Sequence, residues 1–237
     1  MVTERITYRE GDDEFEAFVA YDETRSGKLP AVLVSHAWAG QGDFEQAKCE
    51  VLAELGYVAI ALDNYGVGKR GTTKEENAVL MQPLVEDREL LKRRMLAGYE
   101  LACGLEQVDS ERIGAMGFCF GGLCTLDLAR TGAPLRGVVS FHGILLPSGL
   151  PAEQISAKVL VLHGHEDPMV PPDQVAAFMA EMTAAGADWQ VHQYGSTMHA
   201  FTNPEANDPD FGTVYEPKAE RRSLESMRDF FAEVFAD

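Results

Sequence analysis

The feature that most constrains the fold is a series of short apolar runs separated by longer stretches with helical periodicity. Each run is continuously apolar and rich in Val and Ile, which is typical of strands covered on both faces in a parallel sheet. These runs predict strands over residues 31–35, 58–62, 113–118, 137–141 and 159–163. Residues 188–194 predict a last strand. The intervening stretches predict helices over 44–55, 84–105, 121–131, 172–185 and 218–235. Strand alternating with helix predicts an α/β fold with a mostly parallel central sheet and helices on both faces.

The N-terminal segment has a different pattern. Residues 5–9 and 14–20 flank the turn sequence Gly11-Asp12-Asp13 and predict an antiparallel hairpin at the edge of the sheet. The chain has 237 residues, of which 46% are hydrophobic, and it carries no internal repeat or Gly/Ser linker. That length and composition predict one domain over residues 1–237. The segment 202–215, rich in Pro, Asn and Asp, predicts a long loop that helps to wall a pocket.

The charge balance excludes some classes of partner. With 38 acidic and 20 basic residues the formal net charge is −18, whereas nucleic acids and anionic membranes are bound by clustered Lys and Arg. The expected partner is therefore a small molecule, and we expect a monomer or a small homo-oligomer. No stretch approaches the roughly 18 apolar residues of a membrane span, and no apolar leader follows Met1, so we expect a cytoplasmic protein. The four cysteines lack CxxC spacing, which suits a reducing compartment.

The sharpest motif is Gly117-Phe118-Cys119-Phe120-Gly121-Gly122, which closes one predicted strand and opens a helix. A G-x-nucleophile-x-G turn between strand and helix needs small flanking residues, because a side chain at either glycine crowds the tight turn. The motif predicts Cys119 as a nucleophile, and the positive end of the helix dipole favours its thiolate. The alternative is a buried structural cysteine in a Gly-rich turn.

The acid of such a site follows a later strand, and the histidine comes last, in the order nucleophile, acid, histidine. Asp167 lies in a turn after the predicted strand 159–163, where active-site residues of open α/β sheets collect. Glu166 and Asp173 are its rivals, but the spacing of Asp167 and the Pro that follows it favour Asp167.

His199 is the predicted base, because it lies in a polar loop directly after the last predicted strand. For each of the other five histidines a structural role is the more usual one. The pair His163 and His165 has no HExxH motif or cysteine cluster beside it, so we expect no metal site.

Attack on a carbonyl creates an oxyanion that needs preorganised backbone donors. One is expected from the N–H of Phe120, the residue after the nucleophile. The second is expected from the loop 36–40, with Trp38 as the first choice.

Together, the elbow, the segment Gly164-His165-Glu166-Asp167-Pro168-Met169-Val170-Pro171 and the segment Gly195-Ser196-Thr197-Met198-His199-Ala200-Phe201 resemble the dienelactone hydrolase family. The resemblance runs over almost the whole chain. It implies the α/β-hydrolase fold and a Cys-Asp-His triad that cleaves small esters and lactones through an acyl-thiol intermediate. By resemblance, Cys119 is the nucleophile, Asp167 the acid and His199 the base.

The sequence departs from that family at three positions. Members that open dienelactone carry a glutamate where this chain has Ala37, and two arginines where it has Val67 and Asn203. Lys69 or Arg70 could supply a cation instead. Without those arginines a carboxylate substrate lacks an evident counter-charge, so a substrate other than dienelactone is expected.

The predicted reaction is nucleophilic acyl transfer without metal or organic cofactor. Ala37, Tyr65, His142 and Phe201 are the expected substrate-binding residues. One alternative is a binding protein that keeps the hydrolase scaffold without turnover, which stoichiometric acylation would indicate. Another is a thiol redox role with Cys124 as the resolving cysteine, although a five-residue separation along a helix places the two sulfurs poorly for a disulfide.

Overall fold

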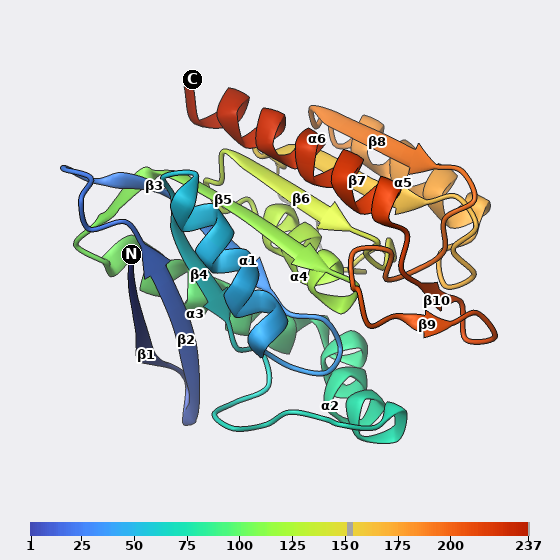
Figure 1. Ribbon diagram of the computed structural model, residues 1–237, viewed down its shortest axis with the longest axis horizontal. Coiled ribbons are helices and arrows are strands. Elements are labelled where there is room, and N and C mark those ends of the chain that lie inside the picture. Colours follow the sequence, from blue (N-terminus) through green and yellow to red (C-terminus); the bar gives the residue numbers. More distant parts are fainter. Residues whose placement is uncertain (151–153, 237) are drawn as a thin grey trace.

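The architecture is centred on one large β-sheet (Figure 1). The structure is a computed structural model that describes residues 1–150 and 154–236. Within these residues eight strands pair in the order β1-β2-β4-β3-β5-β6-β7-β8. Their bounds are β1 (Val2–Glu10), β2 (Asp13–Tyr21), β3 (Leu29–Ser35), β4 (Val58–Leu62), β5 (Val108–Phe118), β6 (Gly137–Phe141), β7 (Lys158–Gly164) and β8 (Trp189–Tyr194).

The strand directions confirm the predicted mostly parallel sheet with an N-terminal hairpin. All neighbouring strands from β4 to β8 run parallel, whereas β2 is antiparallel to both β1 and β4. Glu10 pairs with Asp13, so the turn consists of Gly11 and Asp12 and is one residue shorter than predicted. Gly11 has a φ of +56°, which glycine adopts at little cost in a tight hairpin turn.

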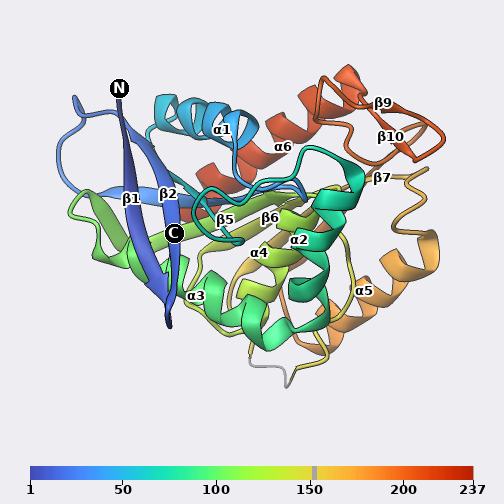
Figure 2. The ribbon, with the colours of Figure 1, turned by 90° about the horizontal axis from the view of Figure 1, so that it is seen from below.

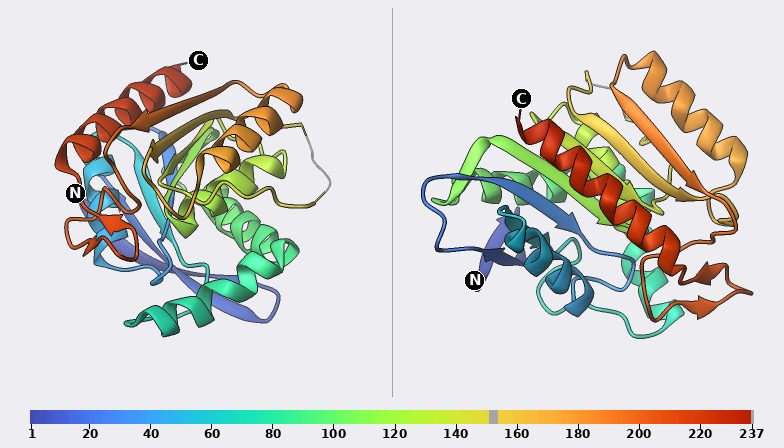
Figure 3. Two further views of the ribbon diagram at one scale, coloured as in Figure 1. Left: turned by 90° about the vertical axis from the view of Figure 1, so that its right-hand side faces the viewer. Right: turned by 45° about the horizontal axis from the view of Figure 1, so that its top comes forward.

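Helices cover both faces of the sheet, as Figures 2 and 3 show. One face carries α1 (Asp43–Glu54) and α6 (Pro217–Ala236), and the other carries α3 (Arg88–Gly104), α4 (Phe120–Arg130) and α5 (Pro172–Ala184). α2 (Lys74–Glu86) precedes α3 at one end of the sheet. No helix among the described residues is both long and apolar enough to cross a bilayer.

The predicted helix 84–105 is wrong in one respect, because it joins the end of α2 to the whole of α3. Asp87 separates them: its φ of −110° and ψ of +87° leave the helical region, and its carboxylate accepts the N–H of Leu90 (2.9 Å) as an N-cap. The apolar periodicity continues across this break, which is why the sequence reads as one helix. Helix α2 was not predicted, although Thr73 caps it by accepting the N–H of Glu76.

The segment 202–215 is more ordered than the sequence predicts. It contains the short antiparallel strands β9 (Asn207–Asp208) and β10 (Thr213–Val214), and His199 forms an isolated bridge with Thr213. This ribbon lies at the end of the sheet where the parallel strands terminate (Figure 1).

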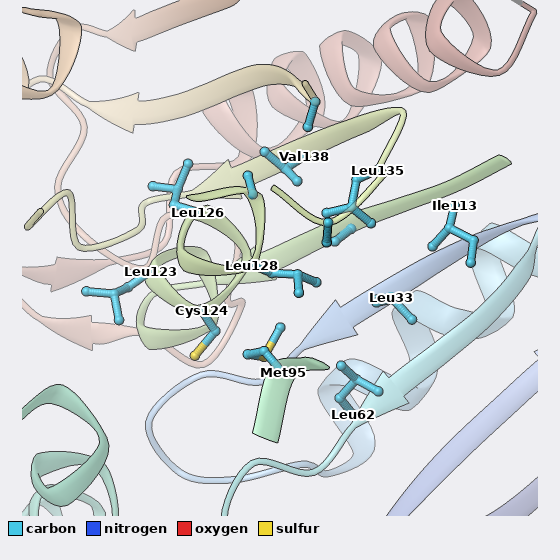
Figure 4. Close-up of a cluster of buried hydrophobic side chains, with 14 of the residues drawn as sticks. Leu33, Leu62, Met95, Ile113, Leu123, Cys124, Leu126, Leu128, Leu135 and Val138 are labelled. Atoms are coloured by element: carbon cyan, nitrogen blue, oxygen red, sulfur yellow. The ribbon is translucent and has the colours of Figure 1, made fainter. Parts of the chain in front are cut away.

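The core fixes the position of α4, because every residue of that helix is buried. Figure 4 shows Leu123, Leu126 and Leu128 of α4 among the side chains of β3, β5 and β6 and beside Met95 of α3. Each large apolar side chain buried in this way contributes about 1.5 to 3 kcal/mol to stability. The N-terminal end of α4 is therefore held rigidly against the end of β5.

Candidate active site

The predicted nucleophile Cys119 occupies a strained turn between β5 and α4. Its φ of +55° and ψ of −116° are rare for a residue with a side chain. Its backbone N–H donates to the carbonyl oxygen of Phe141 (3.0 Å) and to Nδ1 of His142 (3.2 Å). These contacts hold the strained backbone in place and leave the thiol at the surface of a cavity.

Two glycines of the elbow are needed for steric reasons. A Cβ added to Gly117 would overlap the carbonyl oxygen of Gly121. A Cβ added to Gly121 would overlap the carbonyl oxygen of Ser35 at the end of β3. The G-x-C-x-G spacing therefore follows from the close approach of α4 to two neighbouring strand ends.

His199 and Asp167 form a buried pair. Nδ1 of His199 lies 2.7 Å from Oδ2 of Asp167, and these residues are only 1% and 3% exposed. An ionised carboxylate only accepts hydrogen bonds, so Nδ1 donates its proton to Asp167 and Nε2 is left to face another group. The rivals Glu166 and Asp173 are exposed, and neither is paired with His199.

The electrostatics of His199 favour its charged form. Burial lowers the pKa of His199, but the negative charges of Cys119 and Asp167 and the hydrogen bond to Asp167 outweigh that effect and raise it to about 10. Cys119 and His199 line the same cavity, and Nε2 is buried without a hydrogen-bond partner that meets ordinary geometry among the described residues. A protonated imidazole is therefore favoured at this position.

His142 remains neutral beside this pair. Its Nδ1 accepts the N–H of Cys119, so its Nε2 carries the proton and donates it to Oγ1 of Thr202 (2.8 Å). Burial, together with the positive charge on His199, holds the pKa of His142 well below its usual range. The rings of His142 and His199 meet edge to face with centroids 5.1 Å apart. His142 therefore supports the elbow and also lines the cavity.

Two backbone N–H groups beside Cys119 have no partner within the described chain: that of Phe120 at the first residue of α4, and that of Trp38 in the loop after β3. The loop at Trp38 is restrained by Tyr65, whose hydroxyl donates to the carbonyl oxygen of Trp38 (3.0 Å). Both predicted oxyanion donors thus lie beside the elbow and are unused.

The cavity has a volume of about 280 Å³. Of the predicted substrate-binding residues, Ala37 and His142 line it, whereas Tyr65 and Phe201 do not. Tyr65 is buried against His36 and Phe120, and Phe201 is buried against His142. Both side chains act on lining residues and do not line the cavity themselves: Phe201 packs on His142, and the hydroxyl of Tyr65 bonds to Trp38.

The chain matches a known protein family over most of its length. A model of the dienelactone hydrolase family matches residues 15–235 of the chain. The chain belongs to the dienelactone hydrolase family. The mostly parallel sheet and helices have the α/β-hydrolase fold of that family, and the chain is an ester or lactone hydrolase.

Individual relatives agree with the family. A putative carboxymethylenebutenolidase of Yersinia pestis is 26% identical over 235 residues, covering 93% of this chain and 84% of that protein. A probable 2-oxo-3-(5-oxofuran-2-ylidene)propanoate lactonase of a Bradyrhizobium species is 30% identical over 190 residues, covering 74% of this chain and 75% of the relative. Among solved structures, a dienelactone hydrolase-like promiscuous phosphotriesterase from metagenomic libraries superposes with a TM-score of 0.94 at 35% identity, over 99% of this chain and 98% of the other.

The positions at which this dienelactone hydrolase family member was predicted to depart from the family pattern can now be placed. Asn203 lines the cavity, whereas Val67 is 48% exposed and lies outside it. Of the two alternative cations, Arg70 lines the cavity and Lys69 does not. The predicted wall formed by the segment 202–215 is present, since Phe211 from this segment stacks on the ring of Trp38 with centroids 5.6 Å apart.

Sequence reasoning missed Glu45, a buried carboxyl group that reaches the cavity from α1. Its signal was available, because Gly42 followed three residues later by Glu is a capping-box spacing at a helix start. The pattern predicts the cap, but it does not predict that the same side chain reaches the cavity.

Proposed function

We propose that this protein hydrolyses small carboxylic esters or lactones through a triad of Cys119, His199 and Asp167 and an acyl-thiol intermediate. The observation that carries the proposal is the position of His199. Its Nδ1 is bound to Asp167, and its Nε2 is buried, unpaired and in the same cavity as the Cys119 thiol. That arrangement suits an imidazole that exchanges a proton with the sulfur.

At the start of the acylation half-reaction, Nε2 of His199 already holds the proton given up by the Cys119 thiol, and Asp167 stabilises this imidazolium. The thiolate attacks the carbonyl carbon, and the electron pair of the C=O bond moves onto its oxygen. The N–H groups of Phe120 and Trp38 stabilise this oxyanion. When the C=O bond re-forms, the C–O bond to the alcohol breaks, and Nε2 of His199 returns its proton to the leaving oxygen.

In the deacylation half-reaction, His199 acts as a base on water. Nε2 takes one proton from the water as its oxygen attacks the thioester carbonyl. The same two N–H groups hold the second oxyanion, and its collapse breaks the C–S bond. The carboxylic acid leaves, and the thiolate of Cys119 again faces a protonated His199.

The cavity lining favours an uncharged substrate. Its walls are mostly aromatic and aliphatic, contributed by Trp38, Phe44, Met81, Phe118, Ile144, Met169 and Phe211. The charged residues of the lining outside the triad are Glu45 and Arg70, and Arg70 is exposed at the rim and bound to the carbonyl oxygen of Gln41 (3.1 Å). A carboxylate on the substrate would therefore lose water without gaining a buried cation other than His199, which is already paired with Asp167, and this loss is costly.

A matched pair of esters tests both the activity and this preference. Both compounds are phenyl acetate esters of similar shape. Methyl 4-acetoxybenzoate is neutral, whereas 4-acetoxybenzoate carries one negative charge on its carboxylate. We expect kcat/KM for the neutral ester to exceed that for the anion by about tenfold or more, because one desolvated charge costs at least 1.4 kcal/mol. Phenol release followed by absorbance gives both values.

Several outcomes of that assay count against the proposal. Preference for the anion would contradict the neutral substrate class, and Arg70→Gln then tests whether Arg70 supplies the counter-charge. Release of one equivalent of phenol without further turnover would instead favour a binding protein on a hydrolase scaffold. No phenol from either ester, and no opening of small lactones, would contradict the function itself.

The partner is a small molecule under this proposal, and we further propose a monomer or small homo-oligomer in a reducing, cytoplasmic environment. The state of the cysteines supports the last point, since Cys49, Cys103, Cys119 and Cys124 are all free. The redox alternative is disfavoured by the position of Cys124, which is fully buried within α4.

A further inference from the structure

The loop after β3, residues 37–42, carries the Trp38 N–H and is named the oxyanion loop here. We propose that Glu45 is a positioning residue that fixes the shape of the oxyanion loop and so aims the Trp38 N–H at the reacting carbonyl. This inference rests on the proposed function, because it assumes that an oxyanion forms beside Cys119.

The two oxygens of Glu45 join the two ends of the oxyanion loop. Oε1 accepts the N–H of Ala37 (3.2 Å), and Oε2 accepts the N–H of Gly42 (2.9 Å). Glu45 is 2% exposed and lines the cavity. A carboxylate can bridge two donors in this way because both of its oxygens accept hydrogen bonds. Glu45 therefore links the first and the last residue of the oxyanion loop.

Capping of α1 explains only half of this arrangement. A capping box needs a bond from the N3 side chain to the backbone N–H of the N-cap residue, which here is Gly42. The second bond, to Ala37, adds nothing to the helix, because Ala37 lies outside it. That bond acts on the peptide immediately before the Trp38 N–H.

The other contacts of the oxyanion loop support the same reading. The peptide that carries the Trp38 N–H has the carbonyl oxygen of Ala37 at its other end, and Nδ1 of His36 lies 2.6 Å from that oxygen. Nε2 of His36 accepts the N–H of Asn64 (3.1 Å), so Nδ1 carries the proton and donates it. The hydroxyl of Tyr65 donates to the carbonyl oxygen of Trp38, so the peptides before and after the one that carries the Trp38 N–H are both held by hydrogen bonds. Glu45 is the one carboxylate among the groups that make these bonds.

Two reactions of the same thiol separate positioning from other roles. Acylation by p-nitrophenyl acetate passes through an oxyanion, whereas alkylation by iodoacetamide displaces iodide at an sp³ carbon and forms none. We expect Glu45→Met to lower the acylation rate constant by about tenfold or more, a fraction of the loss seen when a whole oxyanion donor is removed. The alkylation rate should change by less than about twofold, because the thiolate itself is untouched.

The variants and controls are matched. Glu45→Gln keeps one accepting oxygen and should recover part of the acylation rate, and it carries the test if the Met variant does not fold. Glu50→Met and Glu50→Gln change an exposed residue of the same helix and should leave both rates unchanged. Urea unfolding of each variant shows whether the fold is retained at the assay temperature.

Three outcomes overturn the inference. An equal fall in acylation and alkylation would show that Glu45 acts on the thiol or on the whole fold. Unchanged acylation in Glu45→Met would show that the oxyanion loop keeps its shape without it. A wild-type protein that is alkylated at Cys119 but never acylated would overturn the proposed function, and this inference with it.

Discussion

Replacement of Cys119 by Ala is expected to lower kcat/KM for p-nitrophenyl acetate by at least about 10³-fold, the size of effect expected when a covalent nucleophile is lost. The alanine keeps the Cβ of the elbow but cannot form the acyl-thiol. The backbone N–H of Cys119 donates to the carbonyl oxygen of Phe141 and to Nδ1 of His142, and these bonds do not involve the sulfur. The fold should therefore survive the change.

Cys103→Ala is the matched control, because Cys103 is a partly exposed cysteine on α3 that does not line the cavity. It should hydrolyse the ester at the wild-type rate. A Cys119→Ala protein that retained more than about one tenth of the wild-type kcat/KM would show that another group attacks the ester.

Replacement of His199 by Ala is expected to remove both the base and the charge that holds the thiolate. The pKa of His199 is raised to about 10, so the imidazole is protonated at neutral pH and loses its proton only in alkaline solution. While it is charged, it favours ionised Cys119. We therefore expect wild-type Cys119 to react with iodoacetamide faster than Cys119 of the His199→Ala variant near neutral pH, and the difference should shrink as the pH rises toward 10 and the imidazole loses its charge.

Without the imidazolium, the thiolate fraction should follow the pKa of an unassisted thiol. Alkylation of His199→Ala should thus rise with pH toward half its maximum near pH 8.5, and at pH 6 it should be about 300-fold slower than its own maximum. Its ester turnover should fall by about 10³-fold.

Peptide mapping assigns the label, and His165→Ala is the matched control. His165 is an exposed histidine close to Asp167 in the sequence, and it pairs with Gln193 instead of the triad. Cys49 and Cys124 should not compete for the reagent, because burial raises the pKa of both thiols. Alkylation profiles that coincide for wild type and His199→Ala would contradict a coupled thiolate and imidazolium.

The sheet and the order of the predicted triad were accessible from the sequence because their signals are local. Continuous apolar runs predicted β3 to β7, and steric crowding at Gly117 and Gly121 explains why the elbow motif is so specific. Asp167 and His199 each follow a strand of the parallel sheet, so their meeting at one edge follows from the topology. Helix α2 was missed because its start depends on a single cap at Thr73.

The cavity wall was less accessible, because it depends on how separate segments pack. Tyr65 and Phe201 follow strands as expected, but both are buried and neither lines the cavity. Glu45 reads as a surface residue of an amphipathic helix, yet α1 begins where its third residue faces the oxyanion loop. Neither outcome is encoded in periodicity or composition.

The central claim is that the acyl group passes through the sulfur of Cys119, and trapping of that intermediate tests it most directly. The protein is mixed with p-nitrophenyl acetate, quenched with acid during the first turnover, digested and mapped by mass spectrometry, with Cys119→Ala treated in the same way. We expect one acetyl group on the peptide that contains Cys119 in the wild type and none in the variant. Acetylation of a different residue at the rate of turnover, or steady turnover with Cys119 never acetylated, would contradict the account.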